Sequence, residues 1–360
     1  MPNDELMPIG AFAQRSGLTS SALRFYADSG LLPPAEVDPV SGYRYYSTDQ
    51  VAQATAVRQL RELAMPLAAV EAVLGSGADE ASRLLDEHVA KVVGDAAAVQ
   101  QKAAVIKSAL GNAPGLPIAV VKGPVLADAV EQVLTAAAHG SGRPALAGLR
   151  IEAGREAVTL TATDRYRLST RTLVPAEPPS QTWAGTVNAD ELRAAAAQIR
   201  RSPLVRLEAV SNGIWFRAAN REDRHCRLLP EEFPDYRLML VSLGEVTTRA
   251  TVSKDLLLRA LEEHPGERIG LHVADHGVSV MSADEGHPDI PLPATVAGQA
   301  LRIWFELTTL YPAVSTAIGP DVLLDLRGHD QPVAIRSADR GDLTTLAMPI
   351  KSDHSAREER

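Results

Sequence analysis

The sequence has only one cysteine, Cys226, in 360 residues. A lone thiol forms neither an intramolecular disulfide nor a thiolate-rich metal site, and this usage is typical of a reducing cytoplasm. Uncharged apolar runs long enough to cross a bilayer are also missing, and the first ten residues hold two acids and no apolar signal-peptide segment. We therefore expect a soluble cytoplasmic protein.

Positive charge is also in short supply. The 36 lysines and arginines are outnumbered by 45 acids, which gives a net charge of −9 and a pI near 5.5. A basic surface over the whole chain is therefore excluded, and any contact with DNA must be local. Disorder is excluded as well, because 45% of the 360 residues are hydrophobic and can fill several cores. The sequence predicts a multidomain protein.

Aromatic residues make up 4% of the chain, yet four of its seven tyrosines lie within residues 26–46. Before this cluster, residues 9–15 predict a short amphipathic helix, and residues 16–18 a turn with glycine. Thr19 or Ser20 can cap a second helix that runs through Tyr26. Two short helices joined by such a turn indicate a helix-turn-helix.

A small wing is predicted next. Pro33, Pro34 and Pro39 exclude a helix, and residues 41–46 (SGYRYY) combine a glycine turn with β-prone aromatic residues. A third helix is predicted to start at the capping signal of residues 47–50. In this order, the segments IGAFAQRSGLTSSALRFYADSGLL, GYRYYS and VRQLRELAMPLAAVEAVL make residues 8–74 similar to the MerR family of transcriptional regulators.

The resemblance implies a DNA-binding surface on the second helix and the wing. Arginine can bind guanine edges or phosphates, and tyrosine hydroxyls can donate to phosphate oxygens. The residues implied to contact DNA are Thr19, Arg24, Tyr26, Tyr43, Arg44 and Tyr46. Five arginines, no lysine and eight acids give residues 1–75 a charge of −3, which departs from simple electrostatic expectation. A protein-binding winged helix with an aromatic core is the alternative.

Residues 79–110 contain no proline, and their apolar residues alternate between spacings of four and three, the heptad pattern of a coiled coil. MerR-like proteins form homodimers through a long antiparallel coiled coil here; a helix packed on its own core is the alternative. The cysteines of metal-sensing members are absent, which excludes a thiolate metal sensor, and His88 and Gly94 lie off the seam. The predicted seam is Leu85, Val89, Val92, Ala96, Val99, Ala103, Ile106 and Leu110.

Beyond residue 117 the sequence repeats. VTLTATD at residues 158–164 lies 120 residues before VSVMSAD at residues 278–284, the helices VLADAVEQVL and LLLRALEEH correspond, and residues 192–217 match residues 307–336. Two successive α+β units are therefore predicted. Segments ATDRYRL (162–168), EFPDY (232–236) and TLAMPIK (345–351) resemble a loop segment, a strand and the C-terminal tail of the bacterial DNA polymerase III β sliding clamp.

This second resemblance covers residues 116–351 and corresponds to clamp domains two and three. A clamp closes a ring of six such domains around DNA, whereas a dimer of this chain has four. Residues 125–139 and 304–317, which hold helices implied to line the ring, contain no lysine or arginine. Encircling DNA would therefore gain little from counterion release, and we expect no replication clamp.

Clamp domains two and three share a hydrophobic pocket for short peptide motifs, which the resemblance carries over position by position. Apolar and methionine side chains would accept apolar anchors, and Arg167 would orient carbonyl groups. Arg165 stands where clamps have glycine, and Leu238 where they have a basic residue. Ordinary junction packing is the alternative, and Tyr236 is interpreted as structural. The implied lining is Leu146, Thr163, Arg165, Tyr166, Arg167, Leu168, Pro234, Met239, Leu346, Met348 and Pro349.

No catalytic or metal-binding constellation is predicted. Residues 272–276 and 284–287 hold histidine and aspartate at expected turns and strand ends, where these residues are common. Cys226, beside His225, is interpreted as a strand residue, and no phosphate-binding glycine loop occurs. We expect a protein that is not an enzyme and needs no cofactor.

The predicted fold is multidomain: an α winged helix-turn-helix and a long coiled-coil helix, followed by two α+β sliding-clamp-like domains. The predicted limits are 1–76 (DNA-binding domain), 77–112 (dimerisation helix), 113–117 (linker), 118–242 and 243–351 (clamp-like domains), and 352–360 (disordered tail).

The two resemblances together imply a homodimer that binds palindromic double-stranded promoter DNA, acts on RNA polymerase indirectly, and senses a peptide or cyclic-peptide antibiotic. One alternative is a DNA-bound adaptor that recruits or sequesters clamp-binding replication or repair proteins. Another is a clamp fragment that only supports dimerisation and binds no ligand.

Overall fold

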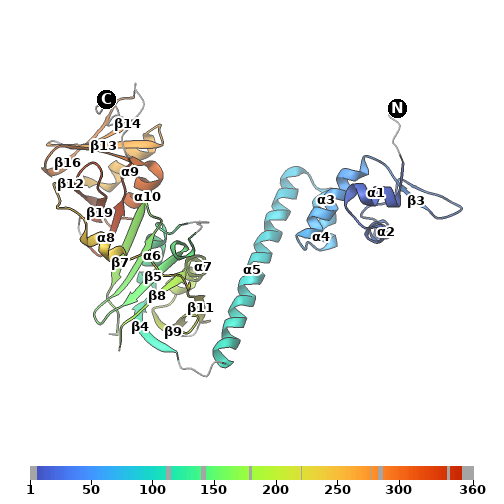
Figure 1. The fold of residues 1–360 in the computed structure, drawn as a ribbon, viewed down its shortest axis with the longest axis horizontal. Helices are drawn as coiled ribbons and strands as arrows, with labels where there is room; N and C mark the ends of the chain where they lie inside the picture. Colours follow the sequence, from blue (N-terminus) through green and yellow to red (C-terminus); the bar gives the residue numbers. More distant parts are fainter. Residues whose placement is uncertain are drawn as a thin grey trace. The chain divides into compact units, whose positions relative to one another are not determined.

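A computed structural model describes residues 6–110, 115–138, 143–177, 181–219, 221–275, 277–282, 287–338 and 341–350 (Figure 1). The chain divides into two compact units, Met1–Ala103 and Ala104–Arg360. Within the described ranges, no helix is both long and apolar enough to span a membrane. The predicted linker lies partly outside these ranges and the predicted tail wholly outside them, and the predicted domain limits stay predictions.

The first unit contains the expected helix-turn-helix. Gly17 ends the first helix in a left-handed conformation (φ +73°), and the Thr19 hydroxyl caps the second by accepting from the Ala22 amide at 3.1 Å. A three-stranded sheet of order β1-β3-β2 forms the wing. The elements are β1 (Met7–Pro8), α1 (Ile9–Ser16), α2 (Ser20–Asp28), β2 (Glu36–Val37), β3 (Arg44–Tyr46), α3 (Gln50–Glu62) and α4 (Leu67–Gly75).

The long helix α5 (Ala78–Leu110) of 33 residues follows. Its first turns belong to the helix-turn-helix domain, because Ala81, Leu84 and Leu85 pack against the core of that domain. The His88 ring nitrogen Nε2 also lies 3.0 Å from the carbonyl oxygen of Leu63, at the end of α3. His88, which lies off the predicted seam, therefore ties α5 to the helix-turn-helix domain.

The second unit contains two copies of one order of elements: strand, helix, four strands, helix, three strands. The second copy has one strand more between its helices. The first copy holds β4 (Leu116–Lys122), α6 (Gly123–Leu134), the 3₁₀ helix η1 (Pro144–Ala147), β5 (Gly148–Ala153), β6 (Val158–Thr163), β7 (Arg167–Leu173), β8 (Trp183–Asn188), α7 (Ala189–Arg200), β9 (Leu204–Val210), β10 (Gly213–Ala218) and β11 (Arg224–Arg227).

The second copy follows the short connecting helix α8 (Tyr236–Val241) and contains one additional strand, β16. It holds β12 (Thr248–Ser253), α9 (Lys254–Glu263), β13 (Arg268–Ala274), β14 (Gly277–Ser282), β15 (Ile290–Leu292), β16 (Ala294–Gly298), β17 (Leu301–Glu306), α10 (Leu307–Ser315), β18 (Asp321–Leu326), β19 (Val333–Ser337) and β20 (Leu343–Ala347). Because β6 and β14 occupy the same place in the two copies, the internal repeat predicted from the sequence is confirmed.

One sheet joins the two copies. Each copy has its own apolar core, and β20 of the second copy pairs antiparallel with β7 of the first. The result is a nine-stranded sheet of order β16-β12-β18-β19-β20-β7-β6-β5-β8, flanked by the four-stranded sheets β11-β10-β9-β4 and β15-β14-β13-β17. The junction between the copies is therefore a continuous hydrogen-bonded ladder.

The prediction of a strand at residues 232–236 is wrong. Residues 232–235 form a loop, and Tyr236 begins α8. The Asp235 carboxylate caps this helix by accepting from the amides of Arg237 (3.2 Å) and Leu238 (3.4 Å). Aspartate in front of a short apolar segment favours this N-cap over a strand.

Candidate DNA-binding surface and ligand site

Helix α2 and the wing form one exposed surface. Arg24, Phe25 and Tyr43 are exposed, and Thr19 is exposed beside them at the start of the helix. Arg44 joins the wing to α2, because its guanidinium donates to the Arg24 carbonyl oxygen at 3.1 Å and to the Asp28 carboxylate at 2.6 Å. This bond fixes the wing against the helix that would enter the DNA groove.

Two of the predicted DNA contacts are core residues instead. Tyr46 is fully buried, its ring stacks on Phe12 with centroids 4.6 Å apart, and its hydroxyl donates to the Leu23 carbonyl oxygen at 3.3 Å. Burial raises the pKa of the Tyr46 hydroxyl above its ordinary value. Tyr26 is buried as well. The expectation that both side chains face DNA is wrong, because they point to the inner faces of β3 and α2.

Phe25 also belongs to this exposed surface, although it is not among the residues predicted to contact DNA. Its side chain is 54% exposed and meets Tyr26 edge to face. The signal was present in the spacing: Leu23 and Tyr26, three residues apart, share the buried face of α2 and leave Arg24 and Phe25 on the outer face.

The apolar seam of α5 is exposed from Val89 onward. Val92 is 46% exposed and Val99 66% exposed, and Val89, Ala96 and Ile106 are also exposed. The assignment of Leu85 to the dimer seam is wrong, because Leu85 packs against the core of the DNA-binding domain and is not free for a partner helix. Ala103 is half-buried, and the side chain of Leu110 lies outside the described part of the chain.

At the junction of the two clamp-like copies, Leu168 of β7, Ala334 of β19 and Leu346 of β20 form a small buried cluster. Leu168 and Leu346 are direct partners in the β7–β20 ladder. The cluster is covered by half-buried side chains of α8 and of the residues after it, namely Tyr236, Met239, Leu240 and Leu243. We call this set the junction cluster.

The structure brings several predicted ligand residues together here. Leu168, Leu346 and Met239 belong to the junction cluster, and the Met348 amide donates to the Tyr166 carbonyl oxygen at 2.8 Å. Pro349 is half-buried beside Met348 in the chain, and Pro234 is exposed in the loop before α8. Leu146 is buried in η1 and lies outside the cluster.

Tyr166, just before β7, is 66% exposed, and Leu238, on α8 beside Met239, is 69% exposed. We call these two exposed apolar residues the rim. Thr163, Leu146, Leu168 and Leu346 are each less than 10% exposed. These four residues pack inside the fold, and their expected role in the pocket wall stays a prediction. The more accessible members of the predicted lining are Arg165, Tyr166, Pro234, Met239, Met348 and Pro349.

The β6–β7 turn is held from within. Oδ1 of Asp164 accepts from the amides of Tyr166 (3.0 Å) and Arg167 (2.7 Å), and the Thr163 hydroxyl donates to the Arg167 carbonyl oxygen at 2.7 Å. The Arg167 guanidinium donates to Oδ2 of Asp164 at 2.7 Å. Asp164 thus accepts from two of the three guanidinium nitrogens, and the expectation that Arg167 orients ligand carbonyls stays a prediction.

Helix α8 is fastened to the first copy by Glu152 of β5. The Tyr236 hydroxyl donates to this carboxylate, and the Arg237 guanidinium binds it at 3.1 Å. Burial, followed by the hydrogen bond to Glu152, raises the pKa of Tyr236 above its ordinary value. Tyr236 is thus a structural residue, as the sequence suggested.

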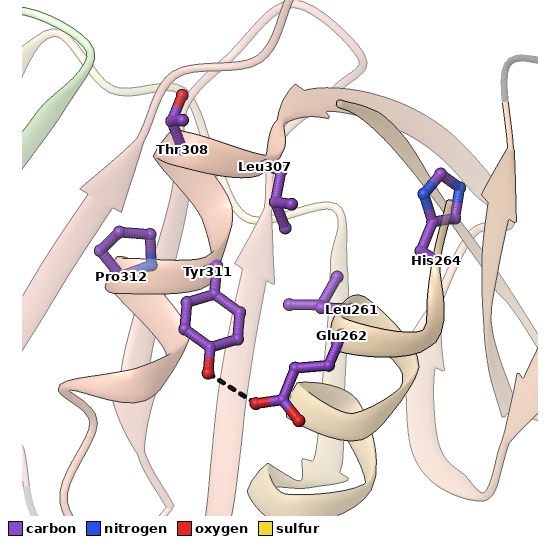
Figure 2. A pocket seen from close by; sticks show the side chains of 7 residues that line it. All are labelled: Leu261, Glu262, His264, Leu307, Thr308, Tyr311 and Pro312. Carbon is purple, nitrogen blue, oxygen red and sulfur yellow. Dashed lines mark hydrogen bonds between the residues drawn. The ribbon is translucent and has the colours of Figure 1, made fainter. Parts of the chain in front are cut away.

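A separate pocket lies in the second copy between α9 and α10, and it contains none of the predicted ligand residues (Figure 2). Its volume is about 330 Å³. The Tyr311 hydroxyl donates to Glu262 at 2.6 Å across it, and this bond raises the pKa of Tyr311. His264 is held by the Gly266 amide and the Met281 carbonyl, each about 3.1 Å from a ring nitrogen, and is structural. The lining is Leu261, Glu262, His264, Leu307, Thr308, Tyr311 and Pro312.

The other candidates do not assemble into a site in the described structure. His272 lies on strand β13, while His276 and residues 284–286 lie outside the described residues. Cys226 lies buried on β11, and burial raises its thiol pKa far above the ordinary value. Within the described residues, no group of three or more His, Cys, Asp or Glu could hold a metal ion.

Comparison with known families gives two separate matches. The MerR HTH family regulatory protein pattern matches residues 7–76, and the central domain of the DNA polymerase III β subunit matches residues 120–235. The β sliding clamp of Streptomyces coelicolor is 31% identical over 261 residues, which are 66% of this chain and 68% of that protein.

Two further relatives concern the ligand question. The β sliding clamp homolog GriR of Streptomyces muensis is 27% identical over 197 residues, about half of each chain. A DnaN sliding clamp from Pseudomonas aeruginosa bound to griselimycin has the same fold over 67% of each chain, with a TM-score of 0.61 and 18% identity.

Proposed function

Because this chain belongs to the DNA polymerase III β sliding clamp family and carries a MerR helix-turn-helix domain at its N-terminus, we propose that its clamp part senses a ligand for a transcriptional regulator. The ligand is a clamp-binding cyclic peptide of the griselimycin type. It switches transcription from a palindromic promoter that a homodimer binds.

The junction cluster is the observation that carries this proposal. A sensor has no need to encircle DNA, but it needs an accessible apolar surface beside ordered secondary structure. Tyr166 lies exposed just before β7, where its carbonyl oxygen accepts from the Met348 amide, and Leu238 lies exposed on α8, the helix that covers the junction cluster. The griselimycin-bound relative has the same fold, and GriR shares about half of its length with this chain.

Switching requires a ligand with different affinities for two conformations of the protein. Helix α5 connects the DNA-binding domain to the clamp part along the chain. In the proposed mechanism the ligand favours the conformation in which the two recognition helices distort the promoter, so that RNA polymerase engages both promoter elements.

The homodimer is tested on the α5 seam. Val92 and Val93 are neighbours on the same helix and are 46% and 64% exposed, but only Val92 lies on the seam. Val92→Glu should convert the dimer to a monomer in analytical ultracentrifugation and abolish promoter binding, whereas Val93→Glu should do neither. Equal behaviour of the two variants would place the dimer interface elsewhere.

The ligand site is tested by isothermal titration calorimetry of griselimycin with the full-length protein. Leu238→Glu should weaken binding at least about tenfold, because it puts a charge on the apolar rim. Val174→Glu is the matched control: Val174 is 86% exposed after β7, away from the junction cluster, and its variant should bind as the wild type does. Leu168→Glu is unsuitable, because Leu168 is buried and its loss would disturb the fold.

The same titration separates the alternatives. Binding that depends on Leu238 and changes in vitro transcription from the cognate promoter supports the sensor. Binding without any change in transcription would indicate a DNA-bound adaptor instead. Absence of binding to the wild type would overturn the ligand proposal and leave a dimerisation scaffold.

A further inference from the structure

Arg165 has an unusual backbone for an arginine. It lies in the β6–β7 turn with φ +81°, in the left-handed region that favours glycine because a Cβ is crowded there. The turn keeps this conformation through hydrogen bonds of Asp164 and Thr163, including one from the Arg165 amide to the Thr163 hydroxyl at 3.2 Å. A glycine would satisfy the same bonds without the strain.

The guanidinium of Arg165 adds no polar contact to the described part of the fold. Arg165 is exposed, and its side chain makes no hydrogen bond or ion pair with any residue that the structure describes. The carboxylate next to it in the chain is already matched, since Asp164 binds Arg167. Arg165 therefore contributes an unmatched positive charge at the edge of the junction cluster.

A strained residue whose side chain has no partner in the chain points to a role outside it. We propose, on the basis of the function above, that Arg165 is a specificity-determining residue that binds a carboxylate of the peptide ligand. Its guanidinium presents a planar fork that matches a carboxylate with two hydrogen bonds. Tyr166, next in the chain, and Leu238 supply apolar contacts, so the preferred ligand is a peptide with apolar anchors and one acidic residue at a fixed distance from them.

The test selects ligands without assuming their sequence. A displayed library of random octapeptides is panned against the full-length wild type, Arg165→Gly and Arg155→Gly. Arg155 is the matched control, because it is exposed in the β5–β6 turn, at the opposite end of β6 from Arg165, and its backbone is not left-handed. Wild type and Arg155→Gly should enrich peptides with Asp or Glu at one position, and Arg165→Gly should enrich the apolar anchors alone.

A selected peptide and its Asp→Asn analogue are then titrated by fluorescence anisotropy. The acidic peptide should bind the wild type about fivefold more tightly than the analogue, and this preference should shrink as salt is raised. Arg165→Gly should bind both equally. This inference is overturned if Arg165→Gly still prefers the acidic peptide, or if the wild type shows no such preference. The proposed ligand site would still stand in either case, provided that binding depends on Leu238. Failure to enrich any Leu238-dependent peptide, together with no binding of griselimycin, overturns both.

Discussion

The strands β7 and β15 occupy the same position in the two clamp-like copies, at the end of the β7-β6-β5-β8 and β15-β14-β13-β17 arrangements. β7 has seven residues and no proline, and it pairs with β20 of the other copy. β15 has three residues, contains Pro291, and has Pro288 and Pro293 close to its ends. Proline cannot donate to a ladder, so it blunts a sheet edge. The two copies thus have equivalent sheet edges, β7 and β15, and the sequence allows only the β7 edge to pair with the other copy. We call the β7–β20 pairing the joint.

The helix pairs differ in a similar way. α6 and α7 of the first copy have 12 residues each, whereas α9 and α10 have 10 and 9, and Pro312 lies inside α10. The pocket of Figure 2 lies between the shorter pair. The two copies therefore share a topology but differ in detail. The β7 edge of the first copy pairs with the second copy, and the pocket of Figure 2 belongs to the second copy.

The largest expected effect comes from weakening the joint. Leu346→Ala removes a buried side chain between the copies and should lower the free energy of unfolding by about 3 kcal/mol, since it leaves a cavity in the junction cluster. Urea unfolding followed by circular dichroism measures this. Leu204→Ala, at an exposed start of β9, should change the unfolding free energy by less than about 0.5 kcal/mol. Similar losses in both variants would mean that Leu346 does not stabilise the joint.

Two tyrosine–glutamate bonds allow a second comparison, one at the joint and one across the pocket. Tyr236→Phe removes the bond to Glu152 and should cost about 1 kcal/mol of stability, whereas Tyr311→Phe should cost less, because its bond to Glu262 is more exposed. Thermal unfolding of both variants at pH 7 measures the difference.

Tyr236 also predicts a pH dependence. Its pKa is raised in the folded protein, so the unfolded chain loses the phenolic proton first. The stability that Tyr236 contributes is complete below the unfolded pKa and declines as pH rises through that value toward the folded pKa. Between about pH 9 and 11, the wild type should therefore lose more stability than Tyr236→Phe. Parallel curves for the two proteins would contradict this role.

A smaller effect, here a gain in the free energy of unfolding, is expected when the strain in the β6–β7 turn is removed. Arg165→Gly should stabilise the protein by about 0.5 to 1 kcal/mol, because the left-handed strain removed exceeds the added freedom of the unfolded chain. Arg155→Gly, without such strain, should be neutral or slightly destabilising. Denaturant midpoints compare the two variants, and stabilisation by Arg155→Gly alone would refute the assignment of strain to Arg165.

The smallest effect concerns the blunted edge. Pro291→Thr restores an amide to β15 and should produce a weak self-association that grows with protein concentration in sedimentation velocity. Pro34→Thr, in the loop before the wing, is the control and should sediment as the wild type does. No change at Pro291 would show that β15 is blocked by something other than its proline.

The sequence predicted the elements of the fold better than the orientation of single side chains. The cap at Thr19 and the spacing of the repeat depend on neighbouring residues, so they can be recognised along the chain. The direction of Tyr46 depends on the register of β3 and on the position of Phe12, 34 residues earlier, and no local pattern contains that information.

The candidate ligand site shows the same limit. Resemblance named Leu168, Leu346 and Met239, and the structure brings them together, but their burial follows from the β7–β20 pairing and from α8. Leu85 fits the heptad spacing equally well as a seam residue or a core residue. Its packing against the DNA-binding domain depends on how α5 leaves α4, which spacing alone does not determine.

The bond between His88 and the Leu63 carbonyl, together with Leu85, fastens the start of α5 to the DNA-binding domain. The 23 residues from His88 to Leu110 then form a helical arm of about 33 Å. A tilt of about 5° at its base moves the far end by about 3 Å over this length. Such a displacement is larger than a hydrogen bond tolerates. In the proposed homodimer, a change in the pairing of two α5 helices would therefore rotate the recognition helices on the DNA.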